Sequence, residues 1–159
     1  MDRKEANPLG NLSQIGFVVR DIDKLVEEMR RVLKVEPTTV IDFVPKKVDY
    51  YGAPANSTAR IAFYEFCNVQ LEFIQPVNGE SIWRDFLNQG KEGLHHIRFS
   101  VDDEDFEQMH KNMAESDINP CQEGHSVVSP GKRWCYFDTE DSLGFVVEVF
   151  NQFGKKAEE

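Results

Sequence analysis

The sequence predicts an α+β fold in which two tandem βαβββ modules form an incomplete barrel around an internal cleft. Three observations predict it. A strand, an acidic turn and a helix occur twice, in that order, along the 159 residues. Each copy is followed by extended segments rich in β-branched and aromatic residues, and each ends on an apolar strand with a central glutamate. One module alone would leave a face of its small sheet uncovered, so we expect the other module to cover it.

The repeat is clearest where each module begins. Residues 14–23 (QIGFVVRDID) match residues 96–105 (HIRFSVDDED) without a gap. Apolar residues alternate along both stretches, as they do in a strand with one buried face. The aspartates that follow are typical of a helix N-terminus, where a carboxylate accepts hydrogen bonds from free backbone N–H groups. We therefore expect a strand-to-helix junction in each copy.

A helix is expected after each junction. Leu25, Met29 and Leu33 recur with helical spacing in the first copy, and apolar residues do the same within residues 106–113 in the second. A shorter helix is expected at residues 80–88, between the two modules. The acidic and basic residues of these segments fall on the opposite faces, which predicts amphipathic helices packed against a sheet.

The remaining segments are expected to be strands. They comprise residues 38–44, 59–67 and 69–75 in the first module and residues 126–128, 132–138 and 144–150 in the second. The second module is shorter between matched positions, and a loop at residues 45–58 of the first is expected to absorb the difference. The predicted organisation is a first module at residues 12–76, a linker with a short helix at 77–92, and a second module at 93–151.

Composition and charge restrict the classes of function. The formal net charge is −10, so the chain lacks the basic excess that nucleic-acid binding requires, and no nucleic-acid partner is expected. We also expect no membrane association, because no apolar run is long enough to span a bilayer. The polar residues 1–10 do not resemble a signal peptide. The three cysteines form no Cys-x-x-Cys pair, which favours free thiols in the cytoplasm.

Strand alternation turns four polar side chains toward the cleft. If the apolar residues of each strand face the helices, then Gln14 and His96 point the other way, and so do Glu72 and Glu148 on the closing strands. A buried carboxylate is costly unless it is paired or bound to a metal. One imidazole, one amide oxygen and two carboxylates suit Zn²⁺, Ni²⁺, Co²⁺ or Mn²⁺. The four residues therefore predict one divalent-metal site in the cleft.

Each of these residues has another explanation when it is considered alone. A strand glutamate is usually solvated on an open sheet face, and a strand histidine is usually a hydrogen-bonded core residue. His95, next to His96, could also be the functional histidine. The metal site is favoured because all four residues fall on equivalent positions of the repeat.

One segment resembles a known family. GLHHIRFSVDD at residues 93–103, preceded by ESI at 80–82 and FL at 86–87, resembles the linker and second-module opening of methylmalonyl-CoA epimerases. These enzymes belong to the vicinal-oxygen-chelate superfamily, which includes glyoxalases, bleomycin-resistance proteins and dioxygenases. GFVVEV at residues 144–149 is similar to the family's closing strand, and the resemblance extends over residues 12–150.

The resemblance implies roles for individual residues. His96 corresponds to a metal ligand, and Glu148 corresponds to a ligand that also acts as an acid and base. The chain departs from the epimerases at Gln14 and Glu72, where they have histidine and glutamine. The resulting Gln/Glu/His/Glu set is similar to that of glyoxalase I enzymes. A second catalytic carboxylate of the epimerases aligns with Ala62, which removes one of their two bases.

Several functions follow from this resemblance. The first is a divalent-metal-dependent epimerase of a methylmalonyl-CoA-type thioester, acting through a metal-stabilised enolate. The alternatives are a glyoxalase I-like lyase or isomerase acting on a thiol adduct, and a non-catalytic small-molecule-binding protein. A ring-cleaving dioxygenase is less favoured, because Gln14 replaces one of the two histidines that non-haem iron requires.

In either enzyme Glu148 is expected to be the first-choice base and Glu72 the second. Arg98 lies on the same strand face as His96 and is expected to bind a substrate carboxylate or phosphate; the alternative is a salt bridge to a neighbouring acid. The resemblance also implies a homodimer.

Overall fold

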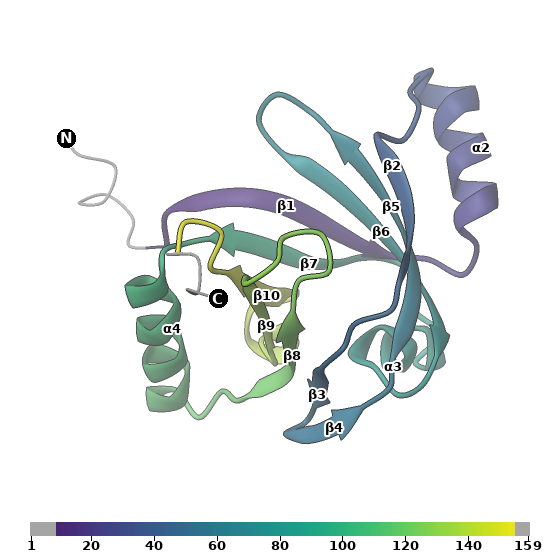
Figure 1. Cartoon of the computed structure of the whole chain (residues 1–159). Helices are drawn as coiled ribbons and strands as arrows, with labels where there is room; N and C mark the ends of the chain where they lie inside the picture. The colour runs from purple at the N-terminus through teal and green to yellow at the C-terminus, as the bar shows by residue number, and fades with distance from the viewer. Residues whose placement is uncertain (1–8, 155–159) are drawn as a thin grey trace.

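The computed structural model describes residues 9–154 and folds them into one curled, mixed sheet of ten strands (Figure 1). In chain order the elements are β1 (Asn11–Val18), α2 (Ile22–Leu33), β2 (Thr39–Phe43), β3 (Val48–Tyr50), β4 (Ala53–Ala55), β5 (Thr58–Glu65), β6 (Gln70–Asn78), α3 (Ile82–Asn88), β7 (Gly93–Ser100), α4 (Asp103–Glu115), β8 (Pro120–His125), β9 (Arg133–Phe137), α5 (Glu140–Leu143) and β10 (Val146–Phe150). Across the sheet the strand order is β2-β5-β6-β1-β7-β10-β9-β8-β3-β4. Most of the polar N-terminal segment considered above lies outside the described residues.

The two opening strands of the repeat meet at the centre of the sheet. β1 pairs antiparallel with β7, and each also pairs in parallel with the closing strand of its own copy, β1 with β6 and β7 with β10. β5 and β9 then pair antiparallel with β6 and β10. The two opening strands and the two closing strands of the repeat are therefore adjacent in the sheet. This brings the middle of β1, β6, β7 and β10 close together.

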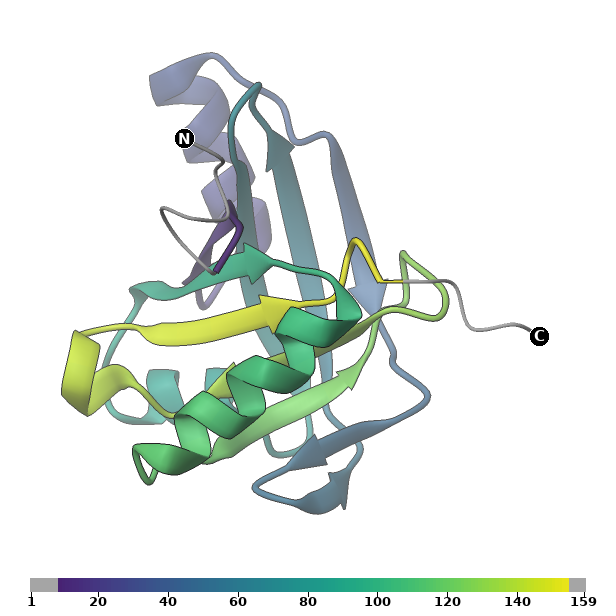
Figure 2. The ribbon, with the colours of Figure 1, turned by 90° about the vertical axis from the view of Figure 1, so that its left-hand side faces the viewer.

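Helices α2 and α4 cover the outside of the sheet on opposite parts of the curl, as Figures 1 and 2 show from two directions. Apolar residues of α2 pack against Phe73 and Tyr64 of the first copy, and those of α4 against Phe137 and Val149 of the second. A third apolar cluster fills part of the concave side and includes residues of α3. The predicted α+β fold, an incomplete barrel with helices outside, is confirmed.

Aspartates begin both helices. The Asp21 carboxylate accepts a hydrogen bond from the Lys24 amide at 3.0 Å, and the Asp102 carboxylate accepts one from the Asp105 amide at 2.9 Å. Each bond satisfies a backbone N–H that has no partner inside the helix. The acidic turns of the repeat are therefore N-terminal caps, as the sequence predicts.

The segment at residues 45–58 is not the loop that the sequence suggests. Its residues form the β3–β4 hairpin, and β3 pairs antiparallel with β8, at the far edge of the other copy's sheet. Tyr51 and Gly52 join the two strands with φ of 47° and 79°, the positive values that a tight two-residue hairpin needs. The inserted residues therefore tie the first copy to the second, and the Tyr50 hydroxyl donates to the Asp85 carboxylate of α3 at 2.7 Å.

The strand expected at residues 126–128 lies elsewhere. The strand in this region is β8, which ends at His125, and the two valines of the segment, Val127 and Val128, are exposed. The Ser126 hydroxyl accepts a hydrogen bond from the Ser129 amide at 3.0 Å, which holds these residues in a turn. The β-branched composition predicted a strand here, but this local side-chain bond stabilises a loop instead.

Among residues 9–154, no helix combines the length and apolar character needed to cross a membrane.

Candidate metal centre

Four buried polar side chains converge on the concave side of the sheet. They are Gln14 on β1, Glu72 on β6, His96 on β7 and Glu148 on β10, and none is more than 8% exposed. They lie together because β6, β1, β7 and β10 are consecutive in the sheet. Their neighbours along each strand, such as Phe73 and Val149, face the outer helices, so strand alternation accounts for the inward direction of all four.

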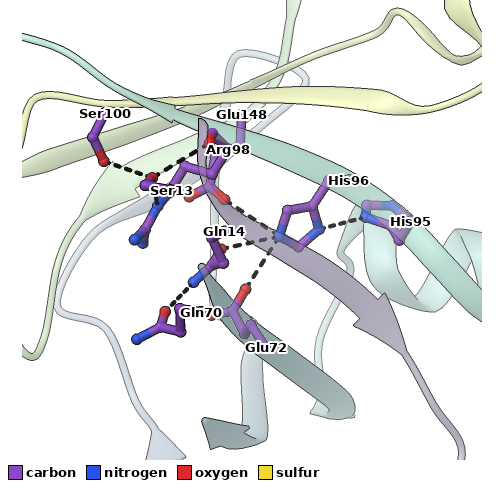
Figure 3. Close-up of polar contacts among 9 residues, drawn as sticks. All are labelled: Ser13, Gln14, Gln70, Glu72, His95, His96, Arg98, Ser100 and Glu148. Atoms are coloured by element: carbon purple, nitrogen blue, oxygen red, sulfur yellow. Dashed lines mark hydrogen bonds and ion pairs between the residues drawn. The ribbon is translucent and has the colours of Figure 1, made fainter. Parts of the chain in front are cut away.

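The imidazole of His96 is the centre of this cluster (Figure 3). Its Nε2 atom lies 3.1 Å from Glu72 Oε2, 3.3 Å from Glu148 Oε2 and 3.3 Å from Gln14 Oε1. Two oxygen or nitrogen donors bound to one zinc ion at 2.0–2.1 Å in a tetrahedron would be about 3.3 Å apart. The donor types and their separations therefore fit a single divalent cation between them.

Gln14 can face the cluster with either the oxygen or the nitrogen of its side-chain amide, since the two groups are nearly equal in size and can exchange places. In one orientation its oxygen faces His96 and its nitrogen donates to Gln70 Oε1 at 2.5 Å. In the other orientation the nitrogen donates to Glu72 and Glu148 at 3.1 and 3.2 Å. The first orientation presents an oxygen to a cation, and the second satisfies the two carboxylates without one.

His95 lies outside the cluster. Its ring packs against Phe86 of α3, and its Nδ1 atom is 3.0 Å from Nδ1 of His96. Burial, with the nearby charge of His96, lowers the pKa of His95 well below its usual value, so His95 stays neutral and able to accept a hydrogen bond. If His96 donates its Nδ1 proton to His95, its Nε2 lone pair is free for a cation.

Glu148 is the carboxylate with the most altered pKa. Burial raises the pKa of Glu148 to about 7, and the charge of Glu72 adds to that effect. His96 and Arg98 act in the opposite direction, as does a hydrogen bond with Tyr136. A carboxylate in this environment binds a proton or a cation more readily than an exposed one does.

Gly16 makes room for the histidine. It pairs with His96 across β1 and β7, and a Cβ atom at position 16 would collide with the imidazole ring. A glycine in the middle of an apolar strand often marks such a close approach. Our sequence interpretation did not assign Gly16 a role, although its position in the strand carried this signal.

Arg98 also points to the concave side, at the edge of the cluster. Its Nε atom donates to the Ser13 hydroxyl at 3.1 Å, and its guanidinium lies 4.9 Å from the centre of the Phe150 ring. Among residues 9–154, Arg98 has no carboxylate within ion-pair distance. The predicted alternative of a salt bridge to a neighbouring acid is therefore not found in this part of the chain.

A cavity of about 310 Å³ opens beside the cluster. Glu72, Glu148 and Arg98 lie at its polar end. Aromatic side chains form much of the remaining wall, namely Phe43, Phe63, Trp83, Trp134, Tyr136 and Phe150. Tyr136, whose ring centre lies 5.0 Å from that of His96, is a residue that sequence reasoning missed. Such a cavity suits a small molecule with a polar end at the cluster and an apolar part against the rings.

The alignment of Ala62 with a catalytic carboxylate of the epimerases would turn Ala62 into the cleft, and the structure contradicts that alignment. Ala62 and Tyr64 face helix α2, whereas Ile61, Phe63 and Glu65 line the cavity. The strand turns the opposite face inward from the one that the alignment with the epimerases assumed. The two inward residues nearest the cluster are apolar, so β5 contributes no carboxylate beside it. Glu65 lies farther along the strand and contacts Gln70.

Comparisons with known proteins agree with this architecture. The model of a family described as "Glyoxalase/Bleomycin resistance protein/Dioxygenase superfamily" matches residues 13–136. A hypothetical protein from Bacillus halodurans C-125 has 20% identity and a TM-score of 0.63, with 94% of this chain and 96% of that chain covered. No curated protein matches the sequence significantly.

Two methylmalonyl-CoA epimerases have similar structures. A variant from Streptomyces coelicolor, in complex with 2-nitronate-propionyl-CoA, has 18% identity and a TM-score of 0.62 over 94% of this chain and 97% of that chain. The enzyme from Mycobacterium tuberculosis has 16% identity and a TM-score of 0.57 over 88% of this chain and 86% of that chain. At these identities the likeness establishes the shared fold.

Proposed function

Because the chain belongs to the glyoxalase/bleomycin resistance/dioxygenase superfamily, we propose that it is a divalent-metal-dependent enzyme that moves a proton next to a carbonyl group. The substrate proposed first is a thioester of the methylmalonyl-CoA type, which the enzyme would epimerise. The observation that supports this best is the pair of buried carboxylates, Glu72 and Glu148, on either side of His96 Nε2 at one end of a cavity.

Gln14, Glu72, His96 and Glu148 would hold the cation, and their donor types fit Zn²⁺, Ni²⁺, Co²⁺ or Mn²⁺. When bound, a divalent cation would hold two neighbouring substrate oxygens and stabilise the negative charge that proton loss places on the carbonyl oxygen. The buried position of the four side chains would keep water away from that charge.

The remaining steps belong to the protein's own groups. Glu148 is proposed as the base that removes the proton from the carbon next to the carbonyl, and Glu72, across the cluster, as the group that can return it from the other side. Arg98 would bind the free carboxylate of the substrate through its guanidinium, which has no carboxylate partner among residues 9–154. The aromatic wall would pack against the apolar part of the substrate.

A second candidate function is a glyoxalase I-like reaction on the adduct of a thiol with a 2-oxoaldehyde. Two observations favour it. The Gln/Glu/His/Glu donor set is similar to that of glyoxalase I enzymes, and the two β5 residues that face the cavity beside the cluster, Ile61 and Phe63, are apolar. In that reaction one proton moves between two adjacent carbons, which a single carboxylate can carry out.

Proton exchange at the substrate tests the first function. The protein is stripped with a chelator, reloaded with one metal at a time, and incubated with methylmalonyl-CoA in deuterium oxide. Metal-dependent deuterium incorporation at the α-carbon, detected by NMR or mass spectrometry, is the expected result. The Glu148→Gln variant should keep its metal and lose the exchange.

The same preparations are offered methylglyoxal together with a thiol. Turnover of this adduct without exchange at the thioester would favour the glyoxalase-like reaction over epimerisation. Absence of both activities in protein of full metal content would contradict the proposed catalysis and favour a binding protein.

A further inference from the structure

A second group of metal-binding side chains lies on the outer face of the sheet, beneath helix α4. It consists of His110 on α4, Glu123 on β8 and Cys135 on β9, and their donor atoms lie within 4.8 Å of one another. Cys135 faces away from the cleft, since its neighbour Tyr136 lines the cavity on the opposite face of β9. We propose that these three residues bind a zinc ion, at a site separate from the one in the cleft.

The strand pairing places two of the donors side by side. Glu123 and Cys135 are cross-strand partners of β8 and β9, and Glu123 Oε2 lies 3.8 Å from Cys135 Sγ. A sulfur at 2.3 Å and an oxygen at about 2.0 Å on one tetrahedral zinc ion would be about 3.5 Å apart. A small movement of the carboxylate is therefore enough for both atoms to bind one ion.

His110 has one ring nitrogen held by the protein backbone. Its Nδ1 atom lies 2.9 Å from the backbone oxygen of Phe106, and a carbonyl oxygen can only accept, so Nδ1 carries the proton. Nε2 is then the ring nitrogen with a free lone pair, as in metal-binding histidines held by a second hydrogen bond. The ring packs between Phe106 and Phe137, at 4.9 and 5.0 Å between ring centres, which limits its rotation.

The surroundings leave room for the ion and for its fourth ligand. A cavity of about 120 Å³ adjoins His110, Glu123 and Cys135, and Asp49 and His125 also line it. A water molecule could complete a tetrahedral shell there. The thiolate favours zinc over magnesium, calcium or manganese, which prefer oxygen ligands. An ion at this place would join α4 to β8 and β9, so we expect it to stabilise the second copy of the repeat and to take no part in catalysis.

Cobalt provides a probe that distinguishes the two sites. A thiolate bound to Co²⁺ gives a charge-transfer band in the near ultraviolet, and the cleft cluster contains no sulfur. We expect this band to appear on titration of the metal-free protein with Co²⁺ and to disappear when Zn²⁺ displaces the cobalt. Because the band depends on sulfur, His96→Gln should leave it unchanged, and a failure of the cleft site would not affect this test.

Variants then assign the band to residues. Cys135→Ser should abolish it, and His110→Gln should weaken cobalt binding by more than about tenfold, since loss of even an outer-shell partner costs about 10- to 100-fold in metal affinity. Cys121→Ser, at a buried cysteine outside the cluster, and Cys67→Ser, at an exposed one, are the matched controls. Circular dichroism checks that each variant is folded. If Cys135→Ser does not fold, His110→Gln still tests the proposal.

The proposal is overturned if the folded wild-type protein gives no thiolate band with excess Co²⁺. It is equally overturned if the band survives in folded Cys135→Ser. The same holds if titration of the band gives His110→Gln the same cobalt affinity as the wild type.

Discussion

Glu72 and Glu148 occupy equivalent places in the two halves of the sheet, but their neighbours differ. Glu72 lies between Gly16 on β1 and Phe63 on β5. Neither neighbour offers a polar side chain. On this side of the cluster the sheet supplies space for the His96 ring and an apolar wall for the cavity.

The neighbours of Glu148 are polar. It pairs with Arg98 on β7 and with Tyr136 on β9, the positions that correspond to Gly16 and Phe63 in the other half. A guanidinium and a phenol can bind a substrate oxygen or orient a carboxylate, whereas a glycine and a phenyl ring cannot. The same residue at the same place in a repeat therefore need not have the same role, because the adjacent strands decide what it can do. Substitutions at these positions and at their neighbours test this asymmetry.

The largest effect is expected when the two glutamates are compared directly. Glu148→Gln keeps a ligand oxygen but cannot accept a proton, so kcat should fall by about 10²- to 10⁴-fold, the usual contribution of a general base. Glu72→Gln should lower kcat less, when both rates are divided by the bound metal measured by elemental analysis. Equal losses in the two variants would contradict the assignment of Glu148 as the principal base.

Arg98 is expected to have the next largest effect. Arg98→Met keeps the aliphatic stem and removes a charged hydrogen-bond donor, an interaction that contributes about 1.5–3 kcal/mol. KM for a substrate with a free carboxylate should rise by about tenfold or more, while KM for a neutral analogue changes little. Arg31→Met, at an exposed ion pair on α2, is the matched control. An unchanged KM in Arg98→Met would place the substrate carboxylate elsewhere.

Gly16→Ala should disturb the cluster from the first copy of the repeat, on the side of Glu72. The added methyl group meets the His96 ring, and overpacking of this kind costs about 1–3 kcal/mol of the free energy of unfolding. Metal affinity should fall with it. The double variant with His96→Ala provides the check, because removal of the ring should make the alanine nearly neutral. If Gly16→Ala destabilises the protein equally with and without the His96 ring, the cause lies outside this contact.

The smallest effect is expected at the pair formed by Tyr136 and Phe63. Loss of one hydrogen bond in Tyr136→Phe should lower kcat by roughly 2- to 10-fold, from a contribution of about 0.5–1.5 kcal/mol. The exchange in the other half, Phe63→Tyr, adds a hydroxyl near Glu72 and should not raise kcat. Steady-state kinetics of both variants and of the double exchange would show whether the tyrosine matters because of its place beside Glu148.

Much of the fold could be predicted because its signals are local. Alternating apolar residues give the strand faces, aspartates such as Asp21 and Asp102 begin the helices, and the repeat relates the halves. The same alternation indicates the inward direction of His96 and Glu148. No distant contact is needed for any of these inferences.

The features that could not be predicted depend on contacts between distant segments. Nothing within residues 45–58 specifies β8 as the partner of β3, because that pairing is decided at the edge of the other copy's sheet. The face of Ala62 depends on the register of β5 against β6, which a one-residue change reverses. His110, Glu123 and Cys135 come from three separate elements, and no spacing in the sequence relates them.

The pairing of β3 with β8 also has a consequence for the order of folding. The hairpin precedes β8 by a long stretch of chain, so β3 has only β4 to pair with until residues 120–137 have folded. Contacts between distant segments form late, since the entropy of closing the intervening loop is lost before the contact is gained. Val48 on β3 belongs to the interior cluster that also contains Trp83 and Trp134. During synthesis the cleft would therefore stay open along this edge until the second copy of the repeat is complete.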